Sequence, residues 1–239
     1  MNNTFYNENI TKDSLARMID HTLLRSDAKT DEIKQLCKEA ATFHFASVCV
    51  NPYFVPVAKK FLEELNASVK ICTVIGFPLG ATSSIAKAAE AFDSVKNGAD
   101  EIDMVIDIGK AVESDTSGSG LDDVRKEIEA IRKICCGHTI LKVIIETCYL
   151  SETQKVNLCQ IVTEAGADYI KTSTGFGTDG ARLEDVRLFR KFLGKNVKIK
   201  AAGGIKTIEQ AKLFLEAGCD RIGSSSLVRT LAKIHEDEV

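Results

Sequence analysis

The stretches NGADEIDM (residues 97–104), AGADYIKT (165–172) and AGCDRIGS (217–224) repeat one pattern, Gly-x-Asp-x-Ile. Glycine takes the left-handed conformation at the end of a helix without a steric penalty, and aspartate suits the turn that follows. Isoleucine then begins a run of residues that favour a strand. Each copy therefore marks a helix that ends and feeds a strand.

Strand-like runs recur along the whole chain and alternate with stretches of helical spacing, such as Ile128, Ile131 and Ile134. Strict alternation predicts a parallel sheet with right-handed crossovers. Eight such units in 239 residues predict a TIM (β/α)8 barrel, with an extra N-terminal helix, as one domain over residues 1–239. The eight runs are MIDHTLL (18–24), ASVCV (46–50), VKICTVIG (69–76), EIDMVI (101–106), LKVIIET (141–147), YIKTS (169–173), VKIKAA (197–202) and RIGSS (221–225).

Two segments lack a strong pattern. VESDTSGSG (112–120) is rich in serine and glycine and is expected to form a flexible surface loop between the fourth strand and its helix. The acidic end IHEDEV (234–239) is expected to be exposed.

Charge and composition exclude several classes of protein. The net charge is −3, and the 31 basic and 34 acidic residues are scattered, which argues against nucleic acid as a partner. No apolar run approaches the roughly 20 residues that span a bilayer, and the first residues lack the pattern of a secretory signal. We therefore expect a cytoplasmic protein with no membrane partner.

Cysteine and histidine spacing gives no sign of a metal site. The four histidines are isolated, and the eight cysteines contain no CxxC pair. Several cysteines lie in apolar runs, so we expect buried, reduced thiols, and we assign Cys49 and Cys72 to packing. We therefore expect no metal ion.

Three charged residues occupy equivalent places on different strands. Side chains alternate across a strand, so if Ile102, Ile170 and Ile199 face the helices, their neighbours point into the barrel. Those neighbours are Asp103, Lys171 and Lys200. A single lysine could simply reach water at a strand end. Three charged side chains in one interior are harder to explain as strand-end residues that reach water. Burying a charge costs several kcal/mol unless the charge is paired or takes part in the chemistry of the site.

A pair of interior lysines suits amine chemistry. A free lysine with a pKa of about 10.4 is charged at neutral pH, and only the neutral amine attacks a carbonyl. A nearby cation and partial desolvation both lower an amine's pKa, and Lys200 could act in this way on Lys171. Asp103 could shuttle protons, through a water, or could only balance the two lysines. Both roles can hold together.

Two loops have the composition of an anion site. Gly203 and Gly204 follow the seventh strand, and the segment Gly223-Ser224-Ser225-Ser226 lies at the end of the eighth, before a short helix. Loops after these two strands bind phosphate in many such barrels, through backbone N–H groups, hydroxyls and a helix N-terminus. A tight turn would explain the Gly-Gly pair equally well.

The roles of the other polar residues in the predicted strands remain open. Lys142 and Glu146 are expected to share one face of the fifth strand, and Asp20 lies in the first strand. Substrate contact, a supporting charge and a structural ion pair are equally compatible with these positions.

Over nearly its whole length the sequence resembles the deoxyribose-phosphate aldolase family. The matching segments are IDHTLL (19–24), SVCVNP (47–52), CTVIGFPLGA (72–81), GADEIDMVI (98–106), LKVIIET (141–147), IKTSTGF (170–176), KAAGGIKT (200–207) and DRIGSSS (220–226).

The resemblance implies a class I lyase that reversibly cleaves 2-deoxy-D-ribose 5-phosphate into acetaldehyde and D-glyceraldehyde 3-phosphate. It implies that Lys171, in the family's KTSTG segment, forms the Schiff base, and that Asp103 and Lys200 relay protons. It implies no metal or organic cofactor, and barrels of this kind often form homodimers. The phosphate contacts carried over from the family fall on Gly175, Gly203, Gly204, Gly223, Ser225 and Ser226.

Two alternative functions remain open. One is another Schiff-base barrel aldolase, such as a transaldolase, which would not use acetaldehyde efficiently. The other is a barrel that binds phosphorylated sugars without turning them over, for which a second interior lysine has no evident purpose.

Overall fold

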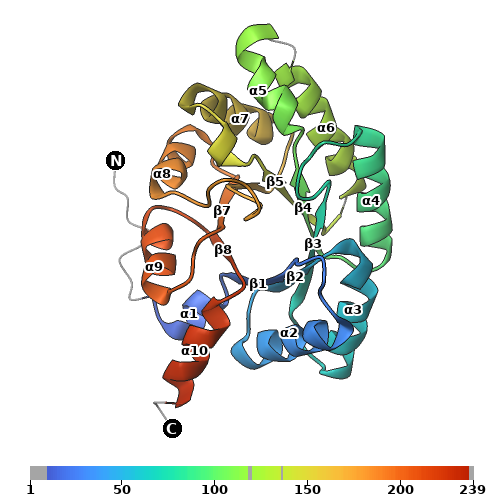
Figure 1. Ribbon diagram of the computed structural model, residues 1–239, viewed down its shortest axis with the longest axis vertical. Coiled ribbons are helices and arrows are strands. Elements are labelled where there is room, and N and C mark those ends of the chain that lie inside the picture. The colour runs from blue at the N-terminus through green and yellow to red at the C-terminus, as the bar shows by residue number, and fades with distance from the viewer. Residues whose placement is uncertain (1–9, 118–119, 136, 237–239) are drawn as a thin grey trace.

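Eight parallel strands close into a barrel in the order of the sequence in the computed structural model, which describes residues 10–117, 120–135 and 137–236 (Figure 1). Each strand pairs with the next, and β8 pairs with β1. Every predicted run overlaps one strand, so the (β/α)8 prediction is confirmed. The strands are β1 (Ile19–Leu23), β2 (Ser47–Val50), β3 (Lys70–Ile75), β4 (Glu101–Val105), β5 (Ile140–Ile144), β6 (Tyr169–Lys171), β7 (Lys198–Ala202) and β8 (Arg221–Ser224).

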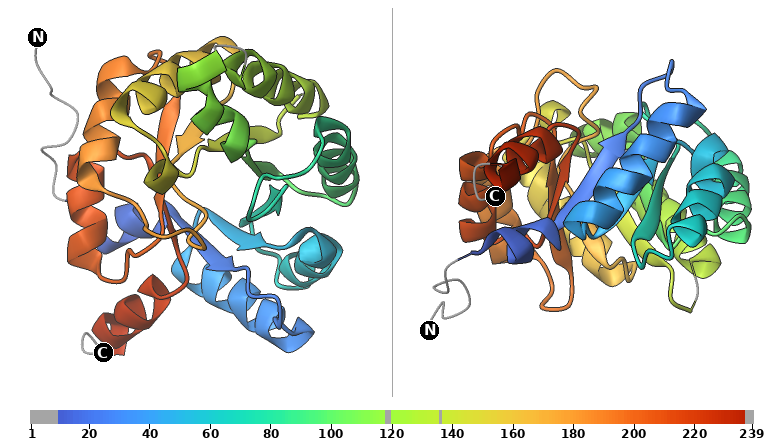
Figure 2. Two further views of the ribbon diagram at one scale, coloured as in Figure 1. Left: turned by 45° about the horizontal axis from the view of Figure 1, so that its top comes forward. Right: turned by 90° about the horizontal axis from the view of Figure 1, so that it is seen from below.

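Helices surround the barrel and shield its outer face (Figures 1 and 2). The expected extra N-terminal helix is α1, which precedes β1. The helices are α1 (Lys12–Ala16), α2 (Thr30–Phe43), α3 (Val55–Glu64), α4 (Ser84–Lys96), α5 (Ile108–Ser117), α6 (Gly120–Ile134), α7 (Glu152–Glu164), α8 (Leu183–Phe192), α9 (Ile208–Glu216) and α10 (Leu227–Glu236), with short 3₁₀ turns at η1 (Pro52–Phe54) and η2 (Thr147–Tyr149).

Strand alternation divides the buried side chains into an outer and an inner set. On β4, Ile102 and Met104 belong to the large core between barrel and helices, whereas Asp103 is buried inside the barrel. A second, smaller cluster is apolar and lies apart from that core. It consists of Leu24, Cys49, Cys72 and Val74, with Phe77 packed against it, and is called here the inner apolar cluster.

The prediction of a surface loop at residues 112–120 is wrong. Residues 112–117 continue α5 to Ser117, and Gly120 begins α6, while residues 118 and 119 lie outside the described part of the chain. Serine and aspartate are weak helix formers, but Ala111 of α5 is fully buried and Ile108 packs against the core. Tertiary packing therefore overrides local propensity here. At the acidic end, α10 extends to Glu236, and residues 237–239 are not described.

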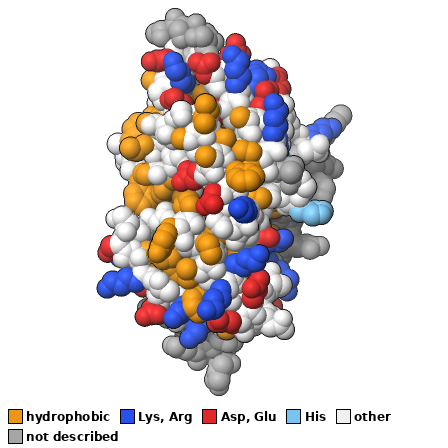
Figure 3. Space-filling view, turned by 90° about the vertical axis from the view of Figure 1, so that its right-hand side faces the viewer, with side chains coloured by type: hydrophobic (Ala, Val, Ile, Leu, Met, Phe, Trp, Pro, Cys, Tyr) orange, Lys and Arg blue, Asp and Glu red, His pale blue; other side chains and the backbone are white. Residues whose placement is uncertain are grey.

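The outer surface mixes charges with scattered apolar side chains. The face seen in Figure 3, on the side of α4, carries several apolar groups. Ile85 and Phe92 of α4 are exposed. No described helix is long and apolar enough to cross a membrane.

Candidate active site

Asp103 of β4 lies at the centre of a buried group of charges inside the barrel. Lys171 of β6 and Lys200 of β7 are direct partners in the strand register, so their side chains emerge on the same side of the sheet. The Nζ atoms of Lys171 and Lys200 lie 2.8 and 2.6 Å from the same oxygen, Asp103 Oδ2. The structure therefore brings the three predicted side chains together.

Lys142 extends this group toward the bottom of the barrel. Its Nζ lies 2.7 Å from Asp103 Oδ1, 2.5 Å from Glu101 and 3.7 Å from Asp20. Arg221 pairs with Asp20 at 2.5 Å and with Glu101 at 3.2 Å. Of the readings left open for Lys142 and Asp20, a buried ion pair is thus present. Glu101 and Arg221 were not foreseen, although Glu101 shares a strand face with Asp103 and could have been found by alternation.

The described network contains more positive than negative groups. Four cations, Lys142, Lys171, Lys200 and Arg221, contact three carboxylates, those of Asp20, Glu101 and Asp103. Lys171 contacts a single carboxylate, whereas each of the other three cations contacts at least two. The described network thus carries one excess positive charge, and Lys171 is the cation with the fewest carboxylate partners in it.

The ionisation of the partners follows from their contacts. Burial alone would raise the pKa of Asp103, but Lys142, Lys171 and Lys200 outweigh it and hold that pKa well below the usual value. Burial would lower the pKa of Lys200, but Asp103 and Asp20 outweigh it and raise that pKa above the ordinary value. The two carboxylates therefore favour the charged form of Lys200. The expected pair of neighbouring cations is present, with a carboxylate between them.

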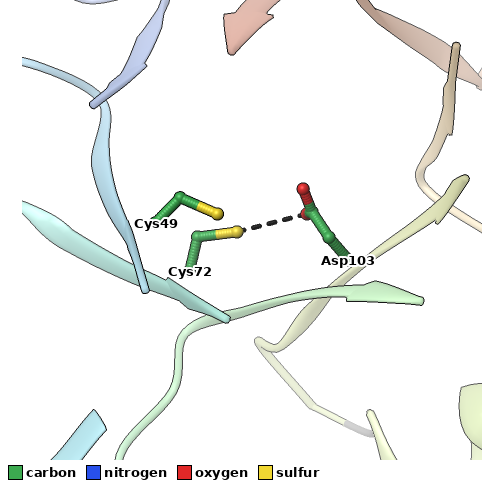
Figure 4. A group of neighbouring side chains, drawn as sticks. All are labelled: Cys49, Cys72 and Asp103. Atoms are coloured by element: carbon green, nitrogen blue, oxygen red, sulfur yellow. Dashed lines mark hydrogen bonds between the residues drawn. The ribbon is translucent and has the colours of Figure 1, made fainter. Parts of the chain in front are cut away.

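The thiol of Cys72 belongs to the site, which corrects its assignment to packing alone. Its Sγ donates to Asp103 Oδ1 at 3.2 Å and accepts from Lys142 Nζ at 3.3 Å. Figure 4 shows Cys49 and Cys72 pointing toward Asp103. These three residues could offer three ligand atoms to a metal ion. Both Asp103 oxygens are already held by lysines, and the surroundings carry an excess positive charge, so the group fits a hydrogen-bonding role better than a cation site.

Glu146 does not share a strand face with Lys142, because β5 ends at Ile144. Glu146 instead adopts a left-handed backbone conformation, with φ of 51°. Its buried carboxylate accepts hydrogen bonds from the backbone N–H of Thr174, at 3.1 Å, and from the Thr174 hydroxyl. It therefore anchors the loop that follows β6.

A cavity of about 910 Å³ opens at the carboxyl ends of β1, β6, β7 and β8. Lys171 lines it, and so do all the residues predicted to bind phosphate: Gly175, Gly203, Gly204, Gly223, Ser225 and Ser226. Gly203 has φ of +90° and Gly175 has φ of +86°, which glycine adopts most readily.

Ser224, which belongs to the predicted anion-binding segment after β8, shapes the last of these loops. Its buried hydroxyl donates to the carbonyl of Ile205 at 2.9 Å and accepts from the N–H groups of Ser226 and Leu227, at 3.2 and 3.3 Å. It thereby ties the loop after β7 to the start of α10, so that both predicted phosphate loops form one edge of the cavity.

Comparison with known proteins agrees with this arrangement. The family model described as "DeoC/LacD family aldolase" matches residues 15–231. Deoxyribose-phosphate aldolase of Clostridioides difficile (strain 630) is 49% identical over 217 residues, which cover 91% of this chain and 95% of that protein. The corresponding protein of Thermococcus gammatolerans is 51% identical over 216 residues, covering 90% and 94%.

Solved structures agree as well. The tetrameric deoxyribose phosphate aldolase of Aeropyrum pernix superposes with a TM-score of 0.84 at 31% identity, covering 94% of this chain and 92% of that chain. An aldolase named QR15 gives a TM-score of 0.83 at 37% identity, covering 93% and 98%. With a family model that spans most of its length and relatives near half identity, the chain belongs to the DeoC/LacD aldolase family.

Proposed function

We propose that this protein is a deoxyribose-phosphate aldolase that reversibly cleaves 2-deoxy-D-ribose 5-phosphate into acetaldehyde and D-glyceraldehyde 3-phosphate through a Schiff base on Lys171. The proposal agrees with the printed activity of relatives that are about half identical to the chain. The remaining support comes from the contacts of Lys171 and from the cavity that it lines.

The observation that carries the proposal is the position of Lys171 within the charged network. Of the four cations in the described network, only Lys171 lines the cavity, and it has the fewest carboxylate partners. It is therefore the cation of this network that a substrate can reach, and the one that the fewest carboxylates hold. A site that only bound a sugar phosphate would use these cations as charges and would not need one of them to lose its proton.

The same contacts give the proton path. Asp103 Oδ2 accepts hydrogen bonds from both Lys171 and Lys200, so a proton that leaves Lys171 has an acceptor at 2.8 Å. The neutral amine then adds to the C1 aldehyde, and loss of water leaves a protonated imine that withdraws electrons from C2. The C2–C3 bond breaks when the C3 hydroxyl loses its proton, and the C3 to C5 fragment departs as D-glyceraldehyde 3-phosphate.

The two-carbon enamine left on Lys171 must gain a proton at C2 before water releases acetaldehyde. Asp103 and Lys200 are the proposed proton carriers, acting directly or through a water. Lys200 Nζ lies 2.6 Å from Asp103 Oδ2, so the proposed proton carriers are in direct contact.

The phosphate is proposed to bind at the loops after β6, β7 and β8, which line the same cavity as Lys171. Gly175, Gly203 and Gly204 present backbone N–H groups there, and Gly223, Ser225 and Ser226 precede the N-terminus of α10. Backbone amides, hydroxyls and a helix N-terminus together suit a phosphate dianion. Binding at these loops would place the aldehyde end of the sugar toward Lys171.

Reductive trapping tests the assignment. Borohydride added with substrate should leave one stable adduct, on the peptide that contains Lys171, and Lys171→Ala should abolish it. Lys206→Ala is the matched control, because Lys206 also lines the cavity but takes no part in the described ion-pair network. Trapping that persists in Lys171→Ala would refute the Schiff-base role. Acetaldehyde as the preferred donor would separate this activity from that of a transaldolase.

We also propose a cytoplasmic homodimer. The exposed side chains of Ile85 and Phe92 on α4 support association, because exposed large apolar groups commonly mark interfaces. Light scattering coupled to gel filtration should give the mass of two 26.1 kDa chains. A mass of one chain, or of four as in the Aeropyrum pernix relative, would refute the dimer.

A further inference from the structure

Two cysteines of the inner apolar cluster lie on neighbouring strands inside the barrel. Cys49 of β2 and Cys72 of β3 are direct partners in the strand register, so both side chains emerge on the same face of the sheet. Both thiols are free and fully buried. Figure 4 shows the two sulfur atoms pointing in the same direction, toward Asp103. The reaction proposed above gives this pair of thiols no role.

The spacing of the two cysteines suits a disulfide bond. Neighbouring strands lie about 4.8 Å apart, which falls inside the range of about 4.4–6.8 Å between the Cα atoms of bridged cysteines. The sulfur atoms of Cys49 and Cys72 and one oxygen of Asp103 already lie within 4.8 Å of one another. Rotation of the two side chains, without a shift of either strand, therefore brings the sulfur atoms into bonding distance.

The two thiols differ in how readily they ionise. A hydrogen bond from Cys72, supported by nearby lysines of the network, lowers the pKa of the Cys49 thiol against the opposing effect of burial. Burial, the contact with Cys49 and the charge of Asp103 raise the pKa of Cys72 well above its usual value. Cys49 is thus the thiol that reaches the nucleophilic thiolate form, and Cys72 is the one that keeps its proton.

We propose that Cys49 and Cys72 form a reversible disulfide bond that switches the site off under oxidising conditions. Formation of the bond does not depend on the proposed function, whereas its effect on activity rests on that function. The inner apolar cluster borders the cavity through Leu24. The proposed oxidant is hydrogen peroxide, a molecule little larger than water, which reaches the thiols from the cavity.

The oxidation has two steps. In the first, the Cys49 thiolate attacks one oxygen of hydrogen peroxide, and a sulfur–oxygen bond forms as the oxygen–oxygen bond breaks. The leaving hydroxide takes up the proton that Cys49 released and becomes water. In the second step, the Cys72 sulfur attacks the oxidised sulfur of Cys49, and the disulfide bond forms as the sulfur–oxygen bond breaks. The second hydroxide leaves with the proton of Cys72 as water, so two thiols are oxidised and one peroxide is reduced to two water molecules.

The disulfide bond removes one contact of Asp103. In the reduced protein the Cys72 thiol donates to Asp103 Oδ1 at 3.2 Å and accepts from Lys142 Nζ at 3.3 Å. A disulfide sulfur has no proton to donate, and the Cys72 sulfur must also move toward Cys49. Asp103 then loses a donor on Oδ1, while its Oδ2 is the oxygen that faces Lys171. The hydrogen bonding of the proposed proton carrier is therefore changed by oxidation.

Peroxide treatment followed by peptide mapping tests the proposal. Trypsin digestion without a reductant should yield peptides 39–59 and 71–87, which carry Cys49 and Cys72, linked to each other. Cleavage of 2-deoxy-D-ribose 5-phosphate, measured after the peroxide is removed, should fall by about 10-fold or more, the range for loss of one hydrogen bond to a charged group. Dithiothreitol should separate the peptides and restore the activity.

Variants of the cysteines locate the effect. Each activity is expressed relative to that of the same variant before treatment. Cys49→Ala cannot form the bridge and should keep its own activity through the treatment, and Cys49→Ser gives the same test if the alanine variant does not fold. Cys148→Ala is the matched control, because Cys148 is the one described cysteine that is not buried. This control should lose activity on oxidation as the native protein does.

The outcomes separate the switch from the function beneath it. Peptides 39–59 and 71–87 that stay unlinked while Cys148 is oxidised would overturn the bridge. Linked peptides in a protein of unchanged activity, or an equal loss of activity in Cys49→Ala, would overturn the switch. A native protein without aldolase activity before treatment contradicts the proposed function instead, and the linkage of the two peptides still decides whether the bridge forms.

Discussion

Replacing Lys200 by methionine tests the charge balance on which amine reactivity depends. The substitution keeps most of the side-chain volume and leaves three cations facing three carboxylates, so the fold should survive. With the excess charge removed, the ammonium form of Lys171 loses a repelling neighbour. The Schiff base should then form only at higher pH.

The size of this effect follows from the geometry. Both nitrogens lie against Asp103 Oδ2, at 2.8 and 2.6 Å, so they are at most about 5.4 Å apart, and the repulsion at that limit is the smallest that these contacts allow. Two like charges at that distance repel by about 3 kcal/mol with an effective dielectric constant of about 20. Since 1.36 kcal/mol corresponds to one pH unit, the midpoint of adduct formation should rise by about two pH units.

The assay is borohydride trapping across a range of pH, with the Lys171 peptide quantified by mass spectrometry. Lys198→Met is the matched control, because Lys198 starts the same strand but is exposed, with its Nζ 5.7 Å from the centre of the Tyr169 ring. Its midpoint should move by less than about half a unit, since solvent screens the charge. A Lys200→Met profile that overlays the native one, or moves to lower pH, would refute the reasoning.

Three further predictions concern stability, the loop after β6 and the cysteines. Three lysines hold the pKa of Asp103 well below its unfolded value, so this ionisation stabilises the fold above about pH 4 and loses that effect as pH falls further. The free energy of unfolding in urea should therefore decline from pH 6 to pH 4 and pH 3, and a constant value would contradict this prediction. Gly180→Ala would place a methyl group 2.4 Å from the carbonyl oxygen of Gly203. We expect KM for the phosphorylated sugar to rise about 10-fold or more with little change for unphosphorylated deoxyribose, as measured by steady-state kinetics; equal effects on both sugars would exclude a phosphate role for this loop. Burial raises the pKa of Cys159 to about 12, so iodoacetamide at pH 8 should alkylate the partly exposed Cys148 first. Peptide mapping checks the order, with both thiols reacting in urea, and equal native rates would argue against the burial of Cys159.

The wrong loop prediction at residues 112–120 shows where local sequence patterns fail to predict secondary structure. Serine, aspartate and glycine lower helix propensity, and a reading of that segment alone favours a loop. Ala111 is nevertheless fully buried, and the helix around it continues to Ser117. Propensity differences are at most about 1 kcal/mol per residue for any residue except proline, so the burial of a few apolar side chains can outweigh them.

The sequence by itself determined the barrel and the inward direction of Asp103, Lys171 and Lys200. Helix ends, turns and the two-residue period of a strand are local properties. The repeat Gly-x-Asp-x-Ile therefore sets the register of the three strands that follow it, and alternation of side chains places Lys200 on its own strand. The same argument located the two loops that are proposed to bind phosphate, because loops after the last strands of a closed barrel lie close together at one edge.

Only the tertiary structure decided how the interior charges pair. Arg221 reaches Asp20, 201 positions away in the chain, because β8 closes against β1. Closure also places Lys142 among three carboxylates and leaves Lys171 with one. The balance of charge around an amine depends on distances between side chains from many strands, and no local pattern encodes those distances.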